Sequence, residues 1–368
     1  MAWMRRTRHV GLAGFRDEPG AGVSARSFLT GRLEELSIGE LAELLELSAR
    51  TWTWRVDDAA TSLAARGFLV SDEAAEPFVA LRRRDAELTA LGWHPAAAAF
   101  HFATTWDGHR GVGPGRDGSP PSRGTRIGSP QTPFHDRGGD RLPLAPVERE
   151  DELHRLLHSR RTARTFEPSR PVSAEELATL LHSVWGAHGT AKLALGDTGL
   201  RKTSPSGGAL HPIEVYPIVR RVESIPAGIY HYRVADHQLE RLASLDEQAC
   251  ARLLERMCAG QWWFADADVG FVMTARFGRS FWKYRRHAKA LKVIHMDAGH
   301  LSQTFYLVCT QLGLGPFVTA AIDDGEIGRT LELDLLFEAP LALCGCGRAA
   351  EPSSRLDPAF RPLPGSST

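Results

Sequence analysis

The sequence predicts an α+β protein in which a helix-flanked sheet follows a winged-helix-like N-terminal region. From Val147 onward, short apolar segments typical of strands alternate with amphipathic segments typical of helices. Before Trp106, two helical segments precede one short strand, and a stretch rich in Gly, Pro and Ser separates the two parts. We therefore predict three parts: a winged-helix-like region over 1–106, a flexible linker over 107–146 and the main domain over 147–368.

Bulk composition excludes several classes of protein. The 368 residues carry 44 basic and 44 acidic side chains, so the formal net charge is zero and general nucleic-acid or membrane-surface binding is not expected. We expect no transmembrane helix, because no apolar run reaches about 18 residues. The N-terminus lacks the apolar core of a secretory signal. Five cysteines, an odd number, do not form a disulfide framework, and we predict a cytoplasmic protein.

In the N-terminal region, residues 38–45 and 57–66 predict two helices. Gly67 is a good helix stop, and 68–70 then predicts a strand. The second helix carries Asp57, Asp58 and one arginine, so it lacks the charge of a DNA-recognition helix. We expect this region to bind a peptide leader, with the strand after Gly67 as the paired edge.

In the main domain, the patterns predict helices at 150–161 and 174–185, strands at 213–219 and 340–344, and a hairpin over 228–242. An apolar stripe from Leu291 to Leu312 predicts a long buried helix, which we expect to open with the run Asp297-Ala298-Gly299-His300-Leu301. Gly313 would end this helix.

Two motifs suit a phosphorylated ligand. In the run from Arg160 to Phe166, a helix would place Arg160 and Arg164 on one face beside Arg161, and guanidinium groups bind phosphate oxygens bidentately. An exposed basic helix end is the alternative interpretation. In Ser204-Pro205-Ser206-Gly207-Gly208, paired glycines let backbone N–H groups approach a flat ligand, although an ordinary turn before a strand would have the same composition.

These motifs resemble the nitroreductase superfamily when they are taken in order. The order is the arginine run, Pro-Ser-Gly-Gly-Ala-Leu-His-Pro from Pro205, Lys283-Tyr284, Asp-Ala-Gly-His-Leu-Ser-Gln from Asp297, and Leu-Gly-Leu-Gly ending at Gly315. The closer resemblance is to the FMN-dependent dehydrogenases that mature ribosomally made peptides, of the streptolysin and thiazole/oxazole type. It covers about Val147 to Arg348.

The resemblance implies FMN at a homodimer interface. Arg160, Arg161 and Thr162 match the phosphate and ribityl contacts, and Arg164 belongs to the same run but is expected to be mainly structural. Pro205, Ser206, Gly207 and Gly208 match the loop against the flavin ring. The segment after Leu314 would add backbone contacts at Gly315, Ala320 and Ala321, where alanines replace paired glycines. Arg348 matches a late phosphate ligand by position.

Lys283 and Tyr284 match the pair that peptide azoline oxidases use for proton removal, and either could be the base. A surface lysine beside an interface tyrosine is the alternative. His295 and His300 are five residues apart and do not share a helical face as a metal pair would, so no metal site is expected.

The predicted function is oxidative maturation of a ribosomal precursor peptide, including azoline-to-azole oxidation, with a cyclodehydratase or other modifying enzyme as a partner. The alternatives are an NAD(P)H-dependent reductase of nitro compounds or dehydroamino acids, and a non-catalytic flavin-binding subunit that recognises a peptide.

Overall fold

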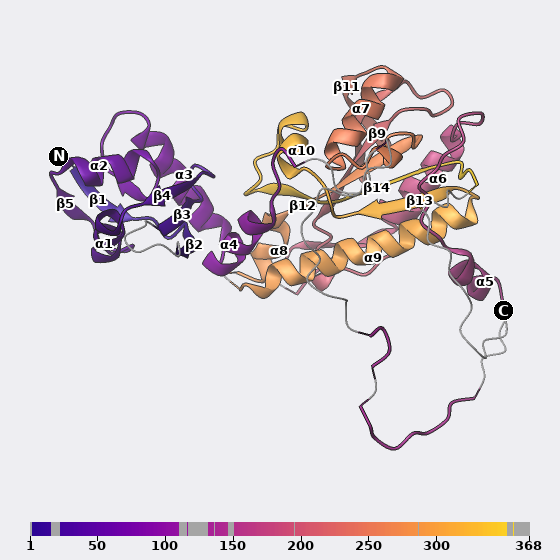
Figure 1. Ribbon diagram of the computed structural model, residues 1–368, viewed down its shortest axis with the longest axis horizontal. Helices are drawn as coiled ribbons and strands as arrows, with labels where there is room; N and C mark the ends of the chain where they lie inside the picture. Colours follow the sequence, from indigo (N-terminus) through magenta and orange to yellow (C-terminus); the bar gives the residue numbers. More distant parts are fainter. Residues whose placement is uncertain are drawn as a thin grey trace.

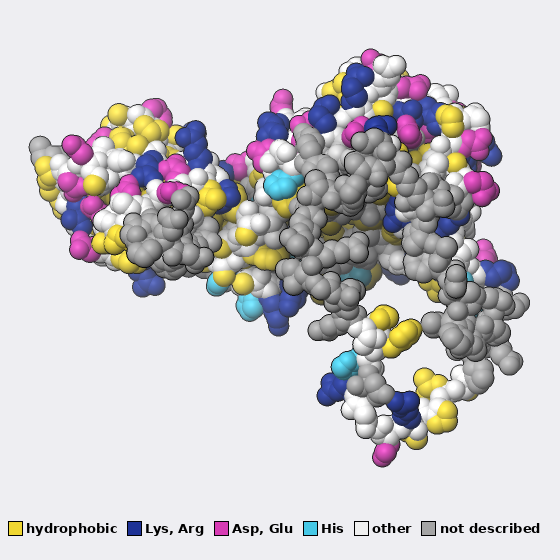
Figure 2. Space-filling model, viewed as in Figure 1, with side chains coloured by type: hydrophobic (Ala, Val, Ile, Leu, Met, Phe, Trp, Pro, Cys, Tyr) yellow, Lys and Arg dark blue, Asp and Glu magenta, His cyan; other side chains and the backbone are white. Residues whose placement is uncertain are grey.

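The computed structural model describes residues 2–15, 23–109, 116, 132–135, 137–145, 151–194, 196–285, 287–351 and 356. They form an N-terminal region beside a larger C-terminal domain (Figure 1). The greater part of the predicted linker, 107–146, lies outside the described residues. Figure 2 shows basic and acidic side chains interspersed over the visible face of both parts. Within the described ranges, no helix has both the length and the apolar character of a membrane span.

Among its described residues, the N-terminal region contains two small antiparallel sheets and four helices. β1 lies between β5 and β6 in the first sheet, and β3 lies between β2 and β4 in the second. The strands are β1 (Ala2–Arg6), β2 (Val10–Phe15), β3 (Val23–Ser27), β4 (Leu33–Leu36), β5 (Thr53–Arg55) and β6 (Leu69–Ser71). The helices are α1 (Ile38–Glu46), α2 (Asp58–Ala65), α3 (Phe78–Leu91) and α4 (Pro95–Thr104).

Local side chains explain where α1 and α2 begin and end. Ser37 and Glu40 form a capping box at α1, and the Asp57 carboxylate accepts the Ala60 N–H at α2. Gly67, at φ +80°, turns the chain from α2 into β6. The helices and the strand predicted here are present, whereas the winged-helix assignment stays a prediction.

A six-stranded antiparallel sheet in the order β11-β10-β9-β12-β14-β13 forms the centre of the C-terminal domain. Its strands are β9 (Ile213–Val219), β10 (Gly228–Arg233), β11 (Gln238–Ser244), β12 (Val269–Arg276), β13 (Gly315–Thr319) and β14 (Glu338–Gly347). A separate hairpin pairs β7 (Gly189–Lys192) with β8 (Thr198–Arg201). The helices are α5 (Glu152–Ser159), α6 (Ala174–Trp185), α7 (Glu247–Met257), α8 (Phe277–Lys283), α9 (Lys289–Gln311) and α10 (Asp324–Thr330), with short 3-10 helices at Gly207–Ala209 and Trp262–Phe264.

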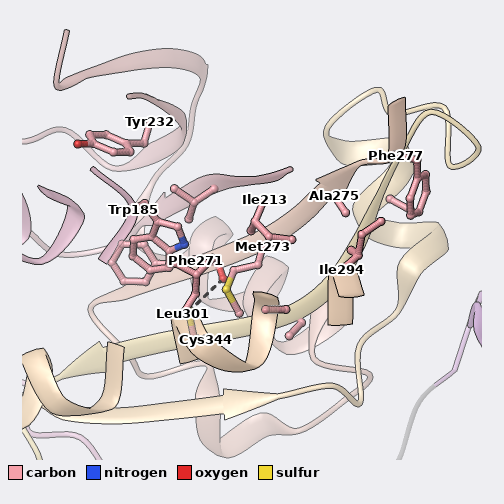
Figure 3. Close-up of a cluster of buried hydrophobic side chains, with 14 of the residues drawn as sticks. Trp185, Ile213, Tyr232, Phe271, Met273, Ala275, Phe277, Ile294, Leu301 and Cys344 are labelled. Carbon is pink, nitrogen blue, oxygen red and sulfur yellow. Dashed lines mark hydrogen bonds between the residues drawn. The ribbon is translucent and has the colours of Figure 1, made fainter. Parts of the chain in front are cut away.

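The core lies on both faces of this sheet, because β12 is buried on both sides. On one face Trp185 of α6 stacks on Phe271 with ring centroids 5.3 Å apart (Figure 3). The ring centroid of Phe305, on α9, lies 5.5 Å from that of Phe271. On the other face Val272 packs in the cluster that contains Leu254 of α7. Alternate residues of β12 thus serve opposite layers, as the twofold repeat of a strand requires.

Direct contacts join the N-terminal region to α8. Trp93 Nε1 donates a hydrogen bond to the Leu336 carbonyl at 2.9 Å, and its ring lies edge-on to Phe277 and Phe281 at 4.9 and 4.8 Å. His101 Nε2 donates to the Leu335 carbonyl at 2.8 Å. Burial lowers the pKa of His101 to about 4, so its neutral form belongs to the fold.

Two predicted helix boundaries were wrong. α5 ends at Ser159, so Arg160 and Arg164 do not share a helical face. The backbone after it pairs with other elements instead: the Ala163 N–H donates to the Pro316 carbonyl at 2.7 Å, and these distant partners override helix propensity. α9 begins at Lys289, eight residues before Asp297, because the buried apolar stripe starts earlier.

Candidate functional site

The glycine loop, residues 204–211, is fixed to the middle of α9. Asp297 accepts hydrogen bonds from the Ser206 hydroxyl at 2.5 Å and from the Gly207 N–H at 3.1 Å. The Ser206 oxygen in turn accepts the His211 N–H at 2.9 Å. Asp297 is buried, and burial raises the pKa of its carboxyl although these hydrogen bonds oppose the change. The loop is therefore held by a buried acid inside the same chain.

Further contacts along α9 continue this attachment. His300 Nδ1 donates to the Pro205 carbonyl at 3.1 Å, and the Ser204 and Thr304 hydroxyls are hydrogen-bonded at 2.6 Å. Together with Asp297, they fix three successive turns of helix to the loop. Such a loop is a rigid platform, which is what binding a flat ring requires.

Lys283 and Tyr284 reach this loop from the end of α8. A Cβ added to Gly208, whose φ is +70°, would lie 2.6 Å from Lys283 Nζ. A Cβ added to Gly207 would lie 3.5 Å from the Tyr284 hydroxyl oxygen and 2.1 Å from Val293 Cγ1. The side chains therefore close over positions that only glycine can occupy without displacing a neighbour. Lys283 is exposed and Tyr284 is half-buried. The predicted catalytic pair and the predicted ring-binding loop form one cluster.

A second lysine, Lys202, lies at the start of this loop. Burial lowers its pKa to about 8, while attraction from Glu214 opposes the change and repulsion from Arg279 adds to it. Burial and the Lys202 charge lower the pKa of His211 to about 4. A cavity of about 10 Å³, enough for one water molecule, is lined by Lys202, Ser206, His211 and Asp297 among others. Lys202 thus places a group that can exchange a proton near neutral pH beside the cavity at this loop.

The arginine segment, residues 160–164, gathers around Tyr306 on α9. The Arg160 guanidinium lies over the Tyr306 ring at 5.1 Å from its centroid. The Thr162 and Tyr306 hydroxyls are hydrogen-bonded at 2.9 Å, and the Val318 N–H donates to the same tyrosine oxygen at 3.2 Å. Within the described residues, neither Arg160 nor Arg161 has an acidic partner. Two guanidinium groups without carboxylates suit an anionic ligand such as a phosphate.

The other predicted cofactor residues near this segment have partners within the protein. A Cβ on Gly315 would lie 2.7 Å from the Ala163 Cβ, so this glycine lets the arginine segment pack on β13. The Arg348 Nη2 donates to both carboxylate oxygens of Glu176 at 2.6 Å, so a phosphate would have to share that guanidinium. Arg164 is half-buried and is bonded within the chain.

The two predicted alanine positions after β13 differ from each other. The Ala321 N–H donates to Thr319 Oγ1 at 3.1 Å, and its carbonyl accepts from Gln261 Nε2 at 2.8 Å, so both of its backbone groups are already bonded. Ala320 is exposed and lines a cavity of about 180 Å³ that His295 also lines.

The two groups of predicted site residues are separated along α9. Asp297 holds the glycine loop and Tyr306 holds the arginine segment, and nine residues of helix place them roughly 14 Å apart along its axis. Figure 1 shows α8, which carries Lys283, and α5, which precedes Arg160, at opposite ends of α9. The two groups of predicted site residues therefore lie at separate places on one chain.

Three residues of this arrangement were missed by sequence reasoning as site residues: Asp297, Tyr306 and Lys202. An acid within an apolar helical stripe is a signal that could have identified Asp297. Tyr306 gives no local signal, because Thr162 is 144 residues away in the sequence. Lys202 gains its altered pKa only from the burial that the fold creates.

The two histidines that were considered as metal ligands make other bonds. His295 Nδ1 donates to the Leu291 carbonyl at 2.7 Å, and His300 holds the glycine loop. In the part of the chain that the structure describes, no three His, Cys, Asp or Glu side chains are grouped to hold a metal. Asp323 is the N-cap of α10, where its side chain accepts the Glu326 N–H.

Comparison with known proteins identifies the family to which the chain belongs. The family model described as the nitroreductase family matches residues 157–348, which is more than half of the chain. The protein named "Putative nitroreductase MJ1384" of Methanocaldococcus jannaschii is 31% identical over 214 residues, which are 58% of this chain and 100% of that protein.

Two similar proteins have names that refer to peptide processing. The trifolitoxin-processing protein TfxB of Rhizobium leguminosarum bv. trifolii is 31% identical over 46% of this chain and 46% of its own length. The microcin B17-processing protein McbC of Escherichia coli is 33% identical over 39% of this chain and 52% of its own length. The chain thus spans about half the length of each of these two relatives.

A solved structure shares the fold. A chain in the E. coli microcin synthetase McbBCD complex with truncated pro-MccB17 matches at a TM-score of 0.50 and 22% identity, over 72% of this chain and 97% of that one. The α+β fold with a helix-flanked sheet agrees with these matches. The chain belongs to the nitroreductase family.

Proposed function

We propose that this protein is an FMN-dependent dehydrogenase that matures a ribosomally made peptide, with azoline-to-azole oxidation as its reaction. The observation that carries the proposal is the contact of Lys283 and Tyr284 with the glycine loop. Reduction of a nitro compound needs no base that removes a proton from carbon, whereas formation of an azole does. The peptide-processing names of two relatives support the same substrate class.

The residues present fit FMN. Arg160 and Arg161 have no acidic partner among the described residues and would hold the phosphate, with the Thr162 hydroxyl beside them. Val293 and Lys283 fill the Cβ positions of Gly207 and Gly208, so a flat ring would have to lie against the other side of this half-buried loop. When bound, the flavin supplies the two-electron acceptor that takes a hydride from the substrate ring.

The protein's own contribution is proton removal and positioning. Lys283 Nζ lies 5.9 Å from the centroid of the Tyr284 ring, so the two groups lie side by side at the glycine loop. Either group can then accept the Cα proton of the azoline ring. Asp297 keeps the loop from moving while the proton is removed.

We also propose a homodimer in which one protomer supplies the arginine segment and the other supplies the glycine loop with Lys283. The separation of the two groups along α9 supports this arrangement. An exposed strip of α9 that includes Met296, at 57% exposure, and Gly299 would provide part of the contact. A site shared in this way is lost when the dimer dissociates.

The N-terminal region is proposed to bind the leader of the precursor peptide. β6 pairs only with β1 among the described strands, but its residues, Leu69–Ser71, are at most 1% exposed, so the edge predicted to take the peptide is covered by the protein itself. At the C-cap of α2, Arg66 is bonded to Glu34 and Glu40, so its charge is not directed to a nucleic acid. A cyclodehydratase or other modifying enzyme is the proposed partner, by analogy with the complex of the structural neighbour.

Anaerobic turnover tests the proposal. The purified protein should contain FMN in about a one-to-one ratio, and a synthetic thiazoline peptide should bleach the flavin and lose about two mass units without NAD(P)H. Turnover only with NAD(P)H would establish the reductase alternative instead. Bound flavin that neither reagent bleaches would indicate a non-catalytic subunit.

A further inference from the structure

A pocket lies where the N-terminal region meets α8, next to the candidate site. Its volume is about 440 Å³, within the range of pockets that bind small ligands. Leu91, the last residue of α3, contributes one wall, and Gly278, Arg279 and Trp282 of α8 contribute another, with Phe337 completing the apolar lining. The pocket therefore combines one residue of α3 with a lining from the nitroreductase domain.

The pocket and the Lys283 cluster share a wall. Trp282 lines the pocket, and the next residue is Lys283. Arg279 also lines the pocket, and its guanidinium donates to the Leu210 carbonyl at 2.9 Å, two residues after Gly208. Because an extended peptide advances about 3.3 Å per residue, a ring at Lys283 would bring a side chain one or two positions away to this pocket.

The charges that line the pocket already have partners. Arg279 lies 3.6 Å from Asp197, and Arg276 lies 3.1 Å from Glu214. Glu338 accepts hydrogen bonds from the hydroxyls of Tyr216 at 2.8 Å and Thr274 at 2.6 Å. A charged ligand would gain little from these groups, whereas the apolar surfaces of Leu91, Trp282 and Phe337 remain to be covered.

We propose that this pocket binds an apolar side chain, aromatic or aliphatic, of the substrate peptide close to the ring that is oxidised. The inference rests on the proposed function, because it takes the peptide at Lys283 as its starting point. It makes Leu91 and Trp282 residues that determine specificity, and it gives the N-terminal region a direct part in substrate selection.

Peptide binding by the full-length protein tests this inference without turnover. The probes are synthetic hexapeptides of glycine with one thiazole, in which phenylalanine, glycine or lysine stands on either side of the ring. On one side, phenylalanine should lower the Kd roughly tenfold relative to glycine, while lysine should give no gain.

Leu91→Trp should fill the pocket, so that the Kd of the glycine peptide divided by the Kd of the phenylalanine peptide comes close to one. Trp282→Ala should lower this Kd ratio by removing an aromatic wall. Gly278→Ala is a milder change, since its Cβ would lie 3.2 Å from Leu91 Cδ1, and it should lower the ratio less. The matched control is Leu242→Trp on β11, where the side chain is 49% exposed, and it should keep the wild-type ratio.

Equal Kd values for the phenylalanine and glycine peptides would overturn the inference. A Kd ratio that stays at the wild-type value in both Leu91→Trp and Trp282→Ala would also overturn it. The corresponding thiazoline peptides separate it from the proposed function. If these peptides bind selectively but are not oxidised, the pocket inference holds and the dehydrogenase proposal fails. If they are oxidised without selective binding, the dehydrogenase proposal holds and the pocket inference fails.

Discussion

The two ends of α9 are built differently. At the Asp297 end, the glycine loop is held by hydrogen bonds within the chain, and Lys283 and Tyr284 close over it. At the Tyr306 end, Arg160 and Arg161 have no acidic partner among the described residues. Satisfied bonds make a rigid surface, and charges without carboxylates make a binding site for an anion. Under the proposed function, cofactor affinity and chemistry would belong to different ends of one helix.

The largest effect is expected from the arginine end. Arg160→Ala with Arg161→Ala should weaken FMN binding by roughly 10²- to 10⁴-fold, because charge-assisted hydrogen bonds to phosphate are worth about 1.5–3 kcal/mol each. Flavin absorbance of the purified double variant measures this loss. Arg170→Ala, an exposed arginine nearby, is the control and should stay yellow. A double variant that still contains FMN in a one-to-one ratio would show that Arg160 and Arg161 do not hold the phosphate.

At the other end, Lys283→Ala and Tyr284→Phe should keep the flavin but slow its reduction by a thiazoline peptide about 10²-fold or more, since a positioned base contributes that much. Stopped-flow reduction compared with FMN content measures the separation. Lys192→Ala, on β7, is the control with an exposed lysine. If either variant loses FMN along with activity, the division between the two ends does not hold.

The free energy of unfolding should depend on pH through His101, whose ring centroid lies 5.3 Å from that of Phe277 in α8. Its pKa is about 4 in the fold against an unperturbed 6.5, so the unfolded chain binds more protons between these values. The free energy of unfolding should therefore fall as the pH drops from 6.5 to 4, by up to about 3 kcal/mol.

Thermal unfolding of wild type and His101→Gln across this pH range measures the effect. The glutamine variant can still donate to the Leu335 carbonyl but does not titrate, so its Tm should fall less on acidification. Parallel pH profiles for the two proteins would show that His101 contributes nothing to acid sensitivity.

The smallest effect is expected from loosening the loop. Asp297→Asn keeps the shape of the side chain but loses one of the two acceptors that bind Ser206 and Gly207, which should cost about 1–3 kcal/mol of stability. Denaturant unfolding measures this cost. FMN affinity should change much less than in the arginine double variant, and an equal loss would mean that the loop and the arginine segment act as one unit.

Sequence reasoning predicted the parts of this arrangement better than their placement. The α+β class follows from local periodicity, and the matched family confirms it. Residues with local signals were placed well: Ala174–Trp185 is a helix with the predicted bounds. The arginine segment was predicted as helix because its pairing with Pro316 lies far away in the sequence. The separation of the two groups along α9 likewise arises from tertiary contacts, which a single sequence does not reveal.

Mixing two inactive variants tests most directly whether opposite ends of α9 from two protomers build one site. Neither the Arg160→Ala/Arg161→Ala chain nor the Lys283→Ala chain should oxidise a thiazoline peptide at an appreciable rate. After co-refolding in equal amounts, half of the dimers should be mixed, and each mixed dimer should contain one intact site. Recovery of roughly a quarter of the wild-type activity per chain is therefore expected. No recovery, although native mass spectrometry shows that mixed dimers have formed, would contradict it.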